Sequence, residues 1–183
     1  MEQTLIIFKP SAIERALVGK VLSRFEQKGL TITGMKMMQL SEELLHQHYS
    51  HLVSKPFFPL ILRSMTASPV IVMVLQGIKA ISVVRSLTGA TNGREALPGT
   101  IRGDFAMSNQ ENIIHASSSP EDAETEIRRF FHPEELFPRT AAATPFINST
   151  DELGIPASPP QGTDSQDKKS ITINSPSSCR KKF

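Results

Sequence analysis

His115 is the side chain in this sequence that is best placed to act as a nucleophile. It lies in Asn112–Ser119, where apolar residues predict a strand and small residues follow the histidine. Glu126 comes in the next predicted helix, so its carboxylate could hold one ring nitrogen and leave the other free to attack. A histidine on such a strand is also often a buried structural residue, and the local residues leave both interpretations open.

Other familiar catalytic and binding motifs are missing from the sequence. Gly99–Asp104 lacks the Gly-Lys-Ser/Thr ending of a phosphate-binding P-loop, and no dinucleotide-binding glycine pattern occurs. His46, His48 and His51 do not share a helix face, so they favour a solvated helix end over a metal site. Because Cys179 is the one cysteine, a disulfide within the sequence and a zinc site of several cysteines are both excluded.

Charge and hydropathy narrow the class of protein further. The 20 Lys and Arg residues against 18 Asp and Glu give a net charge of +2, which argues against a chain built mainly to bind nucleic acid. No apolar run reaches the roughly 18 residues that a membrane span needs, and residues 1–10 lack the features of a secretory signal. We therefore expect a cytoplasmic protein with no membrane partner.

The elements that must position His115 follow from the apolar pattern. Strands are predicted at residues 4–8, 30–40, 70–75 and 112–117, and helices at 13–28, 41–49, 56–65, 79–87 and from 119 onward. Residues 70–75 are apolar on both faces, which predicts a central strand, whereas residues 89–103 hold four glycines and predict a loop. This order predicts an α/β fold of the α+β sandwich type. Its core would be a ferredoxin-like four-stranded antiparallel sheet with helices on one face.

Composition changes after Thr140. Residues 1–140 carry the periodic segments and all five histidines, and they predict one folded domain. Residues 141–183 are rich in Pro, Ser, Thr and Asp, which predicts a disordered tail in which only Ser170–Asn174 has the pattern of a strand. The basic residues near its end favour a solvated segment over a site that recruits an acidic partner.

Five motifs in one order make the sequence resemble the nucleoside diphosphate kinase family. They are Leu5–Pro10, Lys55–Pro59, Gly89–Asn92, Thr100–Phe105 and Asn112–Ser117, and the likeness extends from Thr4 to Leu136. The resemblance implies an enzyme that transfers the γ-phosphate of a nucleoside triphosphate, typically ATP, to a nucleoside diphosphate. It implies a ping-pong mechanism through a phosphohistidine, with Mg²⁺ held mainly by the nucleotide phosphates and with no metal ligand from the protein.

The resemblance also implies a role for each matching residue. His115 is the expected nucleophile, Glu126 and Ser117 are expected to fix its ring, and Lys9 and Tyr49 to lie near the transferred phosphoryl group. The expected nucleotide-binding residues are Lys9, Phe57, Arg85, Thr91, Arg102 and Asn112. Forked guanidinium groups suit phosphate, and an aromatic face stacks on any base. Taken singly, these side chains also fit ordinary roles as core aromatics, helix-end packing residues or solvated charges.

Three positions depart from the family pattern. Ser11 and Ser118 stand where the family commonly has Asp, and Ala116 stands where it has Gly. The change at Ser118 removes a negative charge close to His115. The alternative function is therefore a catalytically weak or silent nucleotide-binding or interaction module of the same fold. Because the family forms homo-oligomers, the resemblance also implies a tetramer or a hexamer.

Overall fold

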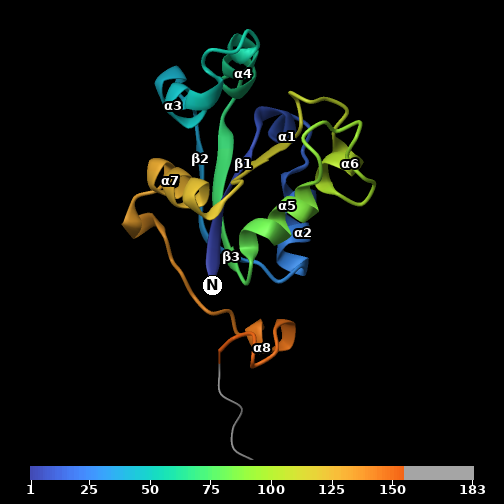
Figure 1. Ribbon diagram of the computed structural model, residues 1–183, viewed down its shortest axis with the longest axis vertical. Coiled ribbons are helices and arrows are strands. Elements are labelled where there is room, and N and C mark those ends of the chain that lie inside the picture. Colours follow the sequence, from blue (N-terminus) through green and yellow to red (C-terminus); the bar gives the residue numbers. More distant parts are fainter. Residues whose placement is uncertain (155–183) are drawn as a thin grey trace, which may run out of the picture.

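A four-stranded antiparallel sheet organises the computed structural model, which describes residues 1–154 (Figure 1). The strands are β1 (Glu2–Phe8), β2 (Thr31–Met38), β3 (Val70–Gly77) and β4 (Ile114–Ala116), in the order β2-β3-β1-β4. The predicted antiparallel sheet is confirmed, and β3 lies inside it as its apolar residues on both faces indicate. β4 is a short edge strand, paired only with β1 among the described residues.

Helices cover both faces of the sheet, so the expectation of helices on one face is wrong. One face carries α1 (Pro10–Glu14), α2 (Val18–Gln27), α5 (Ala80–Thr88) and α6 (Ile101–Phe105). The other carries α3 (Glu42–His48), α4 (Phe58–Met65) and α7 (Pro120–Phe130), with the 3₁₀ turns η1 (Ser50–Leu52) and η2 (Pro133–Glu135) nearby. The reason is the alternation along β1, where Leu5 and Ile7 enter one core while Ile6 and Phe8 enter the other.

The helix predicted over residues 13–28 is two helices. The first, α1, begins at Pro10, whose fixed φ suits the first helical position. Ala16 then has a φ of 51°, in the left-handed region, and this residue separates α1 from α2. Apolar spacing alone does not reveal the interruption, because Leu17 and Val21 still reach the same core.

The loop predicted over residues 89–103 ends in the short helix α6. The Thr100 hydroxyl caps this helix by accepting a hydrogen bond from the Gly103 N–H at 3.1 Å. A Cβ atom on Gly103 would collide with the backbone of Leu97, so the close packing of the loop requires glycine there. These contacts hold the loop against the body of the protein.

Residues 141–154 contain structure that the predicted disordered tail does not include. Thr144–Ile147 forms the helix α8, in which Thr144 is buried and the Ile147 side chain lies against Gly29. Figure 1 shows α8 at the end of the sheet opposite α3 and α4. The rest of the predicted tail, including Ser170–Asn174 and Cys179, lies outside the described residues. The proposed domain boundary after Thr140 therefore stays a prediction.

Candidate active site

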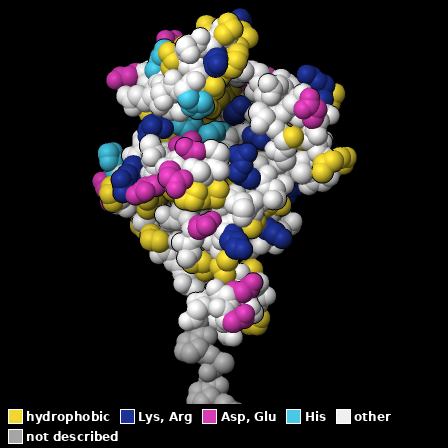
Figure 2. Space-filling view, in the orientation of Figure 1, with side chains coloured by type: hydrophobic (Ala, Val, Ile, Leu, Met, Phe, Trp, Pro, Cys, Tyr) yellow, Lys and Arg dark blue, Asp and Glu magenta, His cyan; other side chains and the backbone are white. Residues whose placement is uncertain are grey.

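A cleft of about 560 Å³ brings the predicted site residues together. It opens beneath the α3–α4 segment, where Figure 2 shows histidine, lysine and arginine side chains around a hollow. Nine of the ten residues singled out in the sequence line it: Lys9, Tyr49, Phe57, Arg85, Thr91, Arg102, Asn112, His115 and Glu126. The tenth, Ser117, is fully buried behind the cleft wall.

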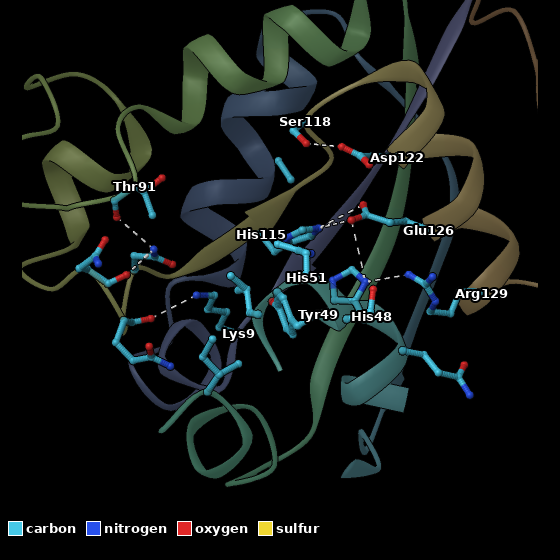
Figure 3. A pocket seen from close by; sticks show the side chains of 18 of the residues that line it. Lys9, His48, Tyr49, His51, Thr91, His115, Ser118, Asp122, Glu126 and Arg129 are labelled. Carbon is cyan, nitrogen blue, oxygen red and sulfur yellow. Dashed lines mark hydrogen bonds and ion pairs between the residues drawn. The ribbon is translucent and has the colours of Figure 1, made fainter. Parts of the chain in front are cut away.

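A hydrogen-bonded chain of three side chains fixes the His115 ring, and Figure 3 shows the contact between His115 and Glu126. Its Nε2 lies 3.0 Å and 3.1 Å from the two carboxylate oxygens of Glu126. The Ser117 hydroxyl donates to the same carboxylate at 2.6 Å and accepts from the backbone N–H of Leu5 at 3.1 Å. The carboxylate is thereby oriented from two sides, as expected for a group that fixes a histidine ring.

Two opposing effects set the protonation of Glu126. Burial alone would raise its pKa, but the hydrogen bonds from His115 and Ser117 and the nearby charge outweigh burial and lower the pKa. The carboxylate is therefore ionised at neutral pH and can only accept hydrogen bonds. Consequently Nε2 of His115 carries the ring proton in the neutral imidazole, and Nδ1 keeps its lone pair.

A strained turn places His115 on β4. Ile113 is fully buried and has a φ of 72°, which is unusual for a β-branched residue. The turn is closed by a hydrogen bond from the Ile114 N–H to the Asn112 carbonyl at 2.8 Å, and the Lys9 N–H donates to the Ile113 carbonyl at 2.9 Å. The end of β1 and the start of β4 are thus tied together beside the nucleophile.

The α7 helix carries Glu126 to His115. Its start matches the sequence prediction, because the Ser119 hydroxyl caps the N–H of Asp122 and Pro120 occupies the first turn. Ser118 donates to the Asp122 carboxylate, and both line the cleft. A carboxylate therefore lies on this wall of the cleft although Ser118 replaces the usual Asp.

Lys9, which is half-buried, and Arg102, which is buried, are cations with lowered pKa values. Burial, and then the charge of Arg102, lower the pKa of Lys9 to about 8, and its Nζ donates to the Gln110 carbonyl at 3.1 Å. Burial, and then the charge of Arg85, lower the pKa of Arg102 to about 10. Like charges held together in a poorly hydrated cleft favour the entry of an anion.

Arg102 also has a structural role that the sequence does not reveal. Its guanidinium donates to the carbonyls of Gly89 at 2.9 Å, Ile114 at 2.8 Å and Asn112 at 3.4 Å. It therefore joins the glycine-containing loop to β4. Since a guanidinium has five N–H donors, two are left for a ligand.

Asn112, Phe57 and Tyr49 line the cleft at different depths, since Asn112 and Tyr49 are buried and Phe57 is exposed. The Asn112 amide donates to the carbonyls of Thr91 at 3.0 Å and Asn109 at 2.8 Å. Phe57 is 43% exposed, so it is an aromatic face at the cleft mouth and not a core residue. Tyr49 is buried with its ring centroid 6.1 Å from that of His115, and burial raises the pKa of its phenol, which stays protonated.

His48 belongs to the site although the sequence interpretation placed it on a solvated helix end. That prediction is wrong, because His48 is buried and its ring centroid lies 4.7 Å from that of His115. His46 and His51 are exposed, as expected. The sequence does contain a signal for the burial of His48. This residue lies three positions after Leu45, so the two share the buried face of the helix.

None of the helices in the part of the chain that the structure describes is long and apolar enough to cross a membrane. This finding agrees with the hydropathy of the sequence, and it leaves the compartment of the protein as a prediction.

Comparisons with known proteins identify the family. The model of the family described as nucleoside diphosphate kinase matches residues 2–136. A nucleoside diphosphate kinase from Parabacteroides distasonis is 56% identical over 137 residues, which cover 75% of this chain and 90% of that protein. One from a strain of Thermus thermophilus is 51% identical over 136 residues, covering 74% of this chain and 99% of that protein.

Solved structures agree with the sequence comparisons. The structure of a halophilic nucleoside diphosphate kinase from Halobacterium salinarum in complex with CDP aligns with a TM-score of 0.78 and 39% identity, covering 80% of this chain and 98% of that one. A nucleoside diphosphate kinase from Encephalitozoon cuniculi aligns with a TM-score of 0.78 and 40% identity, covering 81% of this chain and all of that one. The chain therefore belongs to the nucleoside diphosphate kinase family.

Proposed function

We propose that this chain exchanges phosphoryl groups between nucleoside triphosphates and nucleoside diphosphates, with His115 as the carrier. The observation that supports the proposal most directly is the pair of contacts, 3.0 Å and 3.1 Å long, between Nε2 of His115 and the Glu126 carboxylate. They hold the ring proton on Nε2 and leave Nδ1 as the nucleophile. Family membership supports the same assignment.

The reaction has two half-reactions that balance. In the first, the Nδ1 lone pair forms a bond to the γ-phosphorus while the bond from that phosphorus to the bridging oxygen breaks, and a nucleoside diphosphate leaves. In the second, a terminal phosphate oxygen of another nucleoside diphosphate attacks the phosphorus, and the bond to Nδ1 breaks. Glu126 stabilises the positive ring of the phosphohistidine, as the acidic partner of a catalytic histidine does elsewhere.

We infer that the nucleotide lies along the cleft with its base at the mouth and its phosphates inside. The exposed ring of Phe57 offers a stacking face that reads no base identity. Lys9, Arg85 and Arg102 supply the positive charge that phosphoryl transfer requires. The Halobacterium structure with CDP supports a nucleoside diphosphate as the ligand of this cleft.

We expect Mg²⁺ to enter with the nucleotide phosphates and not on a site built by the protein. Among the described residues, the one group of three potential metal ligands is His48, His115 and Glu126. Two of its three donors are imidazole nitrogens, whereas Mg²⁺ prefers oxygen ligands in an octahedron. When bound, Mg²⁺ neutralises phosphate charge, and the chain's own contribution is the set of cations and the nucleophile.

Labelling with γ-³²P-ATP tests the function. We expect the wild-type protein to take up acid-labile label and to release it to added nucleoside diphosphate, while His115→Ala takes up none. His46→Ala is the matched control, because His46 is exposed and does not line the cleft. A wild-type protein that binds ADP but takes no label would instead be the silent binding module, and full exchange by His115→Ala would refute His115 as the carrier.

The state of assembly and the compartment complete the proposal. We infer a homo-oligomer, because β2 is an edge strand within the described residues and exposes Met35 and Met37, at 41% and 59%. Sedimentation distinguishes a tetramer from a hexamer, and a monomer would contradict the inference. A cytoplasmic location is proposed from the hydropathy of the sequence, and the lack of a nucleic-acid partner from its charge balance.

A further inference from the structure

His48 is packed behind the nucleophile with little freedom to move. Its side chain has no exposed surface, and its ring makes edge-to-face contacts with Tyr49, His115 and Phe130 at centroid distances of 4.5 Å, 4.7 Å and 5.2 Å. It is the last residue of α3, so it connects the α3–α4 segment to α7 at the reaction centre. A ring held this firmly presents its two nitrogens in fixed directions.

Arg129 determines which nitrogen of His48 carries the proton. A guanidinium nitrogen of Arg129 lies 3.3 Å from Nδ1 of His48, and a guanidinium can only donate. Oε1 of Glu126 lies 3.9 Å from the same Nδ1, beyond hydrogen-bond distance. Nδ1 therefore accepts from Arg129. Burial, and then the charge of His115, lower the pKa of His48 to about 3, so the ring is neutral and its proton lies on Nε2.

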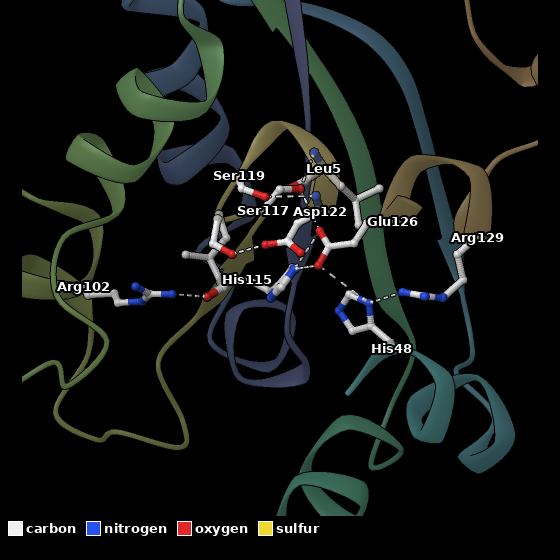
Figure 4. A network of polar contacts seen from close by, with 11 residues as sticks. Leu5, His48, Arg102, His115, Ser117, Ser119, Asp122, Glu126 and Arg129 are labelled. Carbon is white, nitrogen blue, oxygen red and sulfur yellow. Dashed lines mark hydrogen bonds and ion pairs between the residues drawn. The ribbon is translucent and has the colours of Figure 1, made fainter. Parts of the chain in front are cut away.

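This Nε2–H group is a buried donor that no described residue satisfies. Residues 1–154 offer no hydrogen-bond acceptor to it, and the atom is shielded from solvent. A buried donor left unpaired destabilises the folded state, and proteins tolerate this chiefly at functional sites. Figure 4 shows this nitrogen on the edge of the ring away from Arg129, on the side where His115 lies.

Phosphorylation of His115 would bring an acceptor to this side of the His48 ring. The phosphoryl group attached to Nδ1 extends beyond the imidazole ring and carries three acceptor oxygens. The His48 ring centre is only 4.7 Å from that of His115, so an oxygen on the nearer side comes within reach of the donor. Lys9 and Arg102, which also line the cleft, are donors and cannot satisfy Nε2–H.

We propose that His48 donates a hydrogen bond from Nε2 to the phosphoryl group on His115, and that Arg129 positions this donor by fixing the His48 tautomer. The proposal rests on the phosphohistidine of the proposed function. A neutral donor suits the role. It stabilises the negative charge on the equatorial oxygens of the transition state, and it does not attract the phosphoryl group as strongly as another cation would. Arg129 lies one turn after Glu126, so α7 positions both histidines.

Amide substitutions separate the two nitrogens of His48. The amide of Asn lies near the Nδ1 position and that of Gln near the Nε2 position, so His48→Asn removes the donor and His48→Gln restores one. We expect His48→Asn to slow ³²P-phosphoenzyme formation in single-turnover experiments by about 10- to 100-fold, with the affinity for ADP unchanged, and His48→Gln to recover most of the rate. His46→Asn is the matched control on the same helix.

A measurement on the wild-type protein avoids any variant that fails to fold. In ¹⁵N NMR we expect His48 to be protonated at Nε2 and its Nε2–H signal to shift on phosphorylation of His115.

In Arg129→Met we expect a mixture of tautomers and a several-fold slower labelling rate, with Arg129→Lys close to wild type. Labelling of His48→Asn at the wild-type rate, or an unmoved Nε2–H signal in the phosphoenzyme, overturns the role of His48 alone. A wild-type protein that takes no label overturns the proposed function and this inference together.

Discussion

The lowered pKa of Lys9 predicts that nucleotide binding takes up a proton above pH 8. Burial and the charge of Arg102 bring this pKa to about 8, while Glu111 opposes them in part. Phosphate oxygens placed beside Nζ favour the charged amine and raise its pKa again, toward the usual value of about 10.4. Lys9 is therefore largely neutral in the free protein at pH 9 and charged in the complex.

The size of the effect follows from the two pKa values. Below about pH 8 Lys9 is protonated in both the free protein and the nucleotide complex, so the affinity does not depend on its titration. Between about pH 8 and pH 10 only the complex keeps it, so affinity falls about tenfold per pH unit, or about 1.4 kcal/mol, and uptake approaches about one proton. Measurements should stop near pH 9.5, because the pKa of Arg102 is about 10.

Isothermal titration calorimetry with ADP, in two buffers of different ionisation enthalpy at pH 7, 8 and 9, counts this proton. We expect Lys9→Met to bind ADP more weakly at pH 7 and to lose the uptake at pH 9, and Lys9→Arg to bind with little pH dependence. Lys20→Met, at an exposed position, is the control. Equal proton uptake by wild type and Lys9→Met, or a wild-type affinity that is flat from pH 7 to 9.5, would refute the reasoning.

Three further predictions concern positioning and stability. Glu126→Gln should lower turnover about 100- to 10,000-fold by unfixing the His115 tautomer, with normal circular dichroism; wild-type turnover would contradict it. Gly103→Ala should lower the free energy of urea unfolding by about 1–3 kcal/mol, because its Cβ meets the Leu97 backbone; an unchanged midpoint would contradict it. Deleting residues 141–183 should leave turnover unchanged, since α8 lies at the far end of the sheet, but should cost about 1 kcal/mol of stability; loss of turnover would contradict it.

The sequence predicts those parts of the site that depend on local pattern. Periodicity predicts the strand around His115, and capping residues predict the start of α7. Together they place Glu126 more than one turn into that helix. The two-sided core follows less directly. The apolar run at 70–75 indicates that both faces of the sheet are covered at β3. Only with that information do the alternating side chains of β1 predict one core on each face.

What could not be predicted depends on contacts between distant segments. Arg102 is a solvated charge by local composition, yet three carbonyls from two separate segments surround its guanidinium. The environment of His48 includes Arg129, 81 positions away. The packing of α8 depends on Gly29, because a side chain at that position would collide with Ile147, and no local pattern reveals this contact. In each case tertiary packing decides between interpretations that the sequence leaves equal.

The central position of β1 has a consequence for synthesis and folding. Its two neighbours in the sheet, β3 and β4, follow it by roughly 60 and roughly 100 residues. At a synthesis rate of about 5–20 residues per second, β1 leaves the ribosome several seconds before either partner exists. During that time a strand with five consecutive side chains destined for full burial has two open edges. Chaperone binding and aggregation of the nascent chain should therefore concentrate on this segment, which also carries Lys9 at its end.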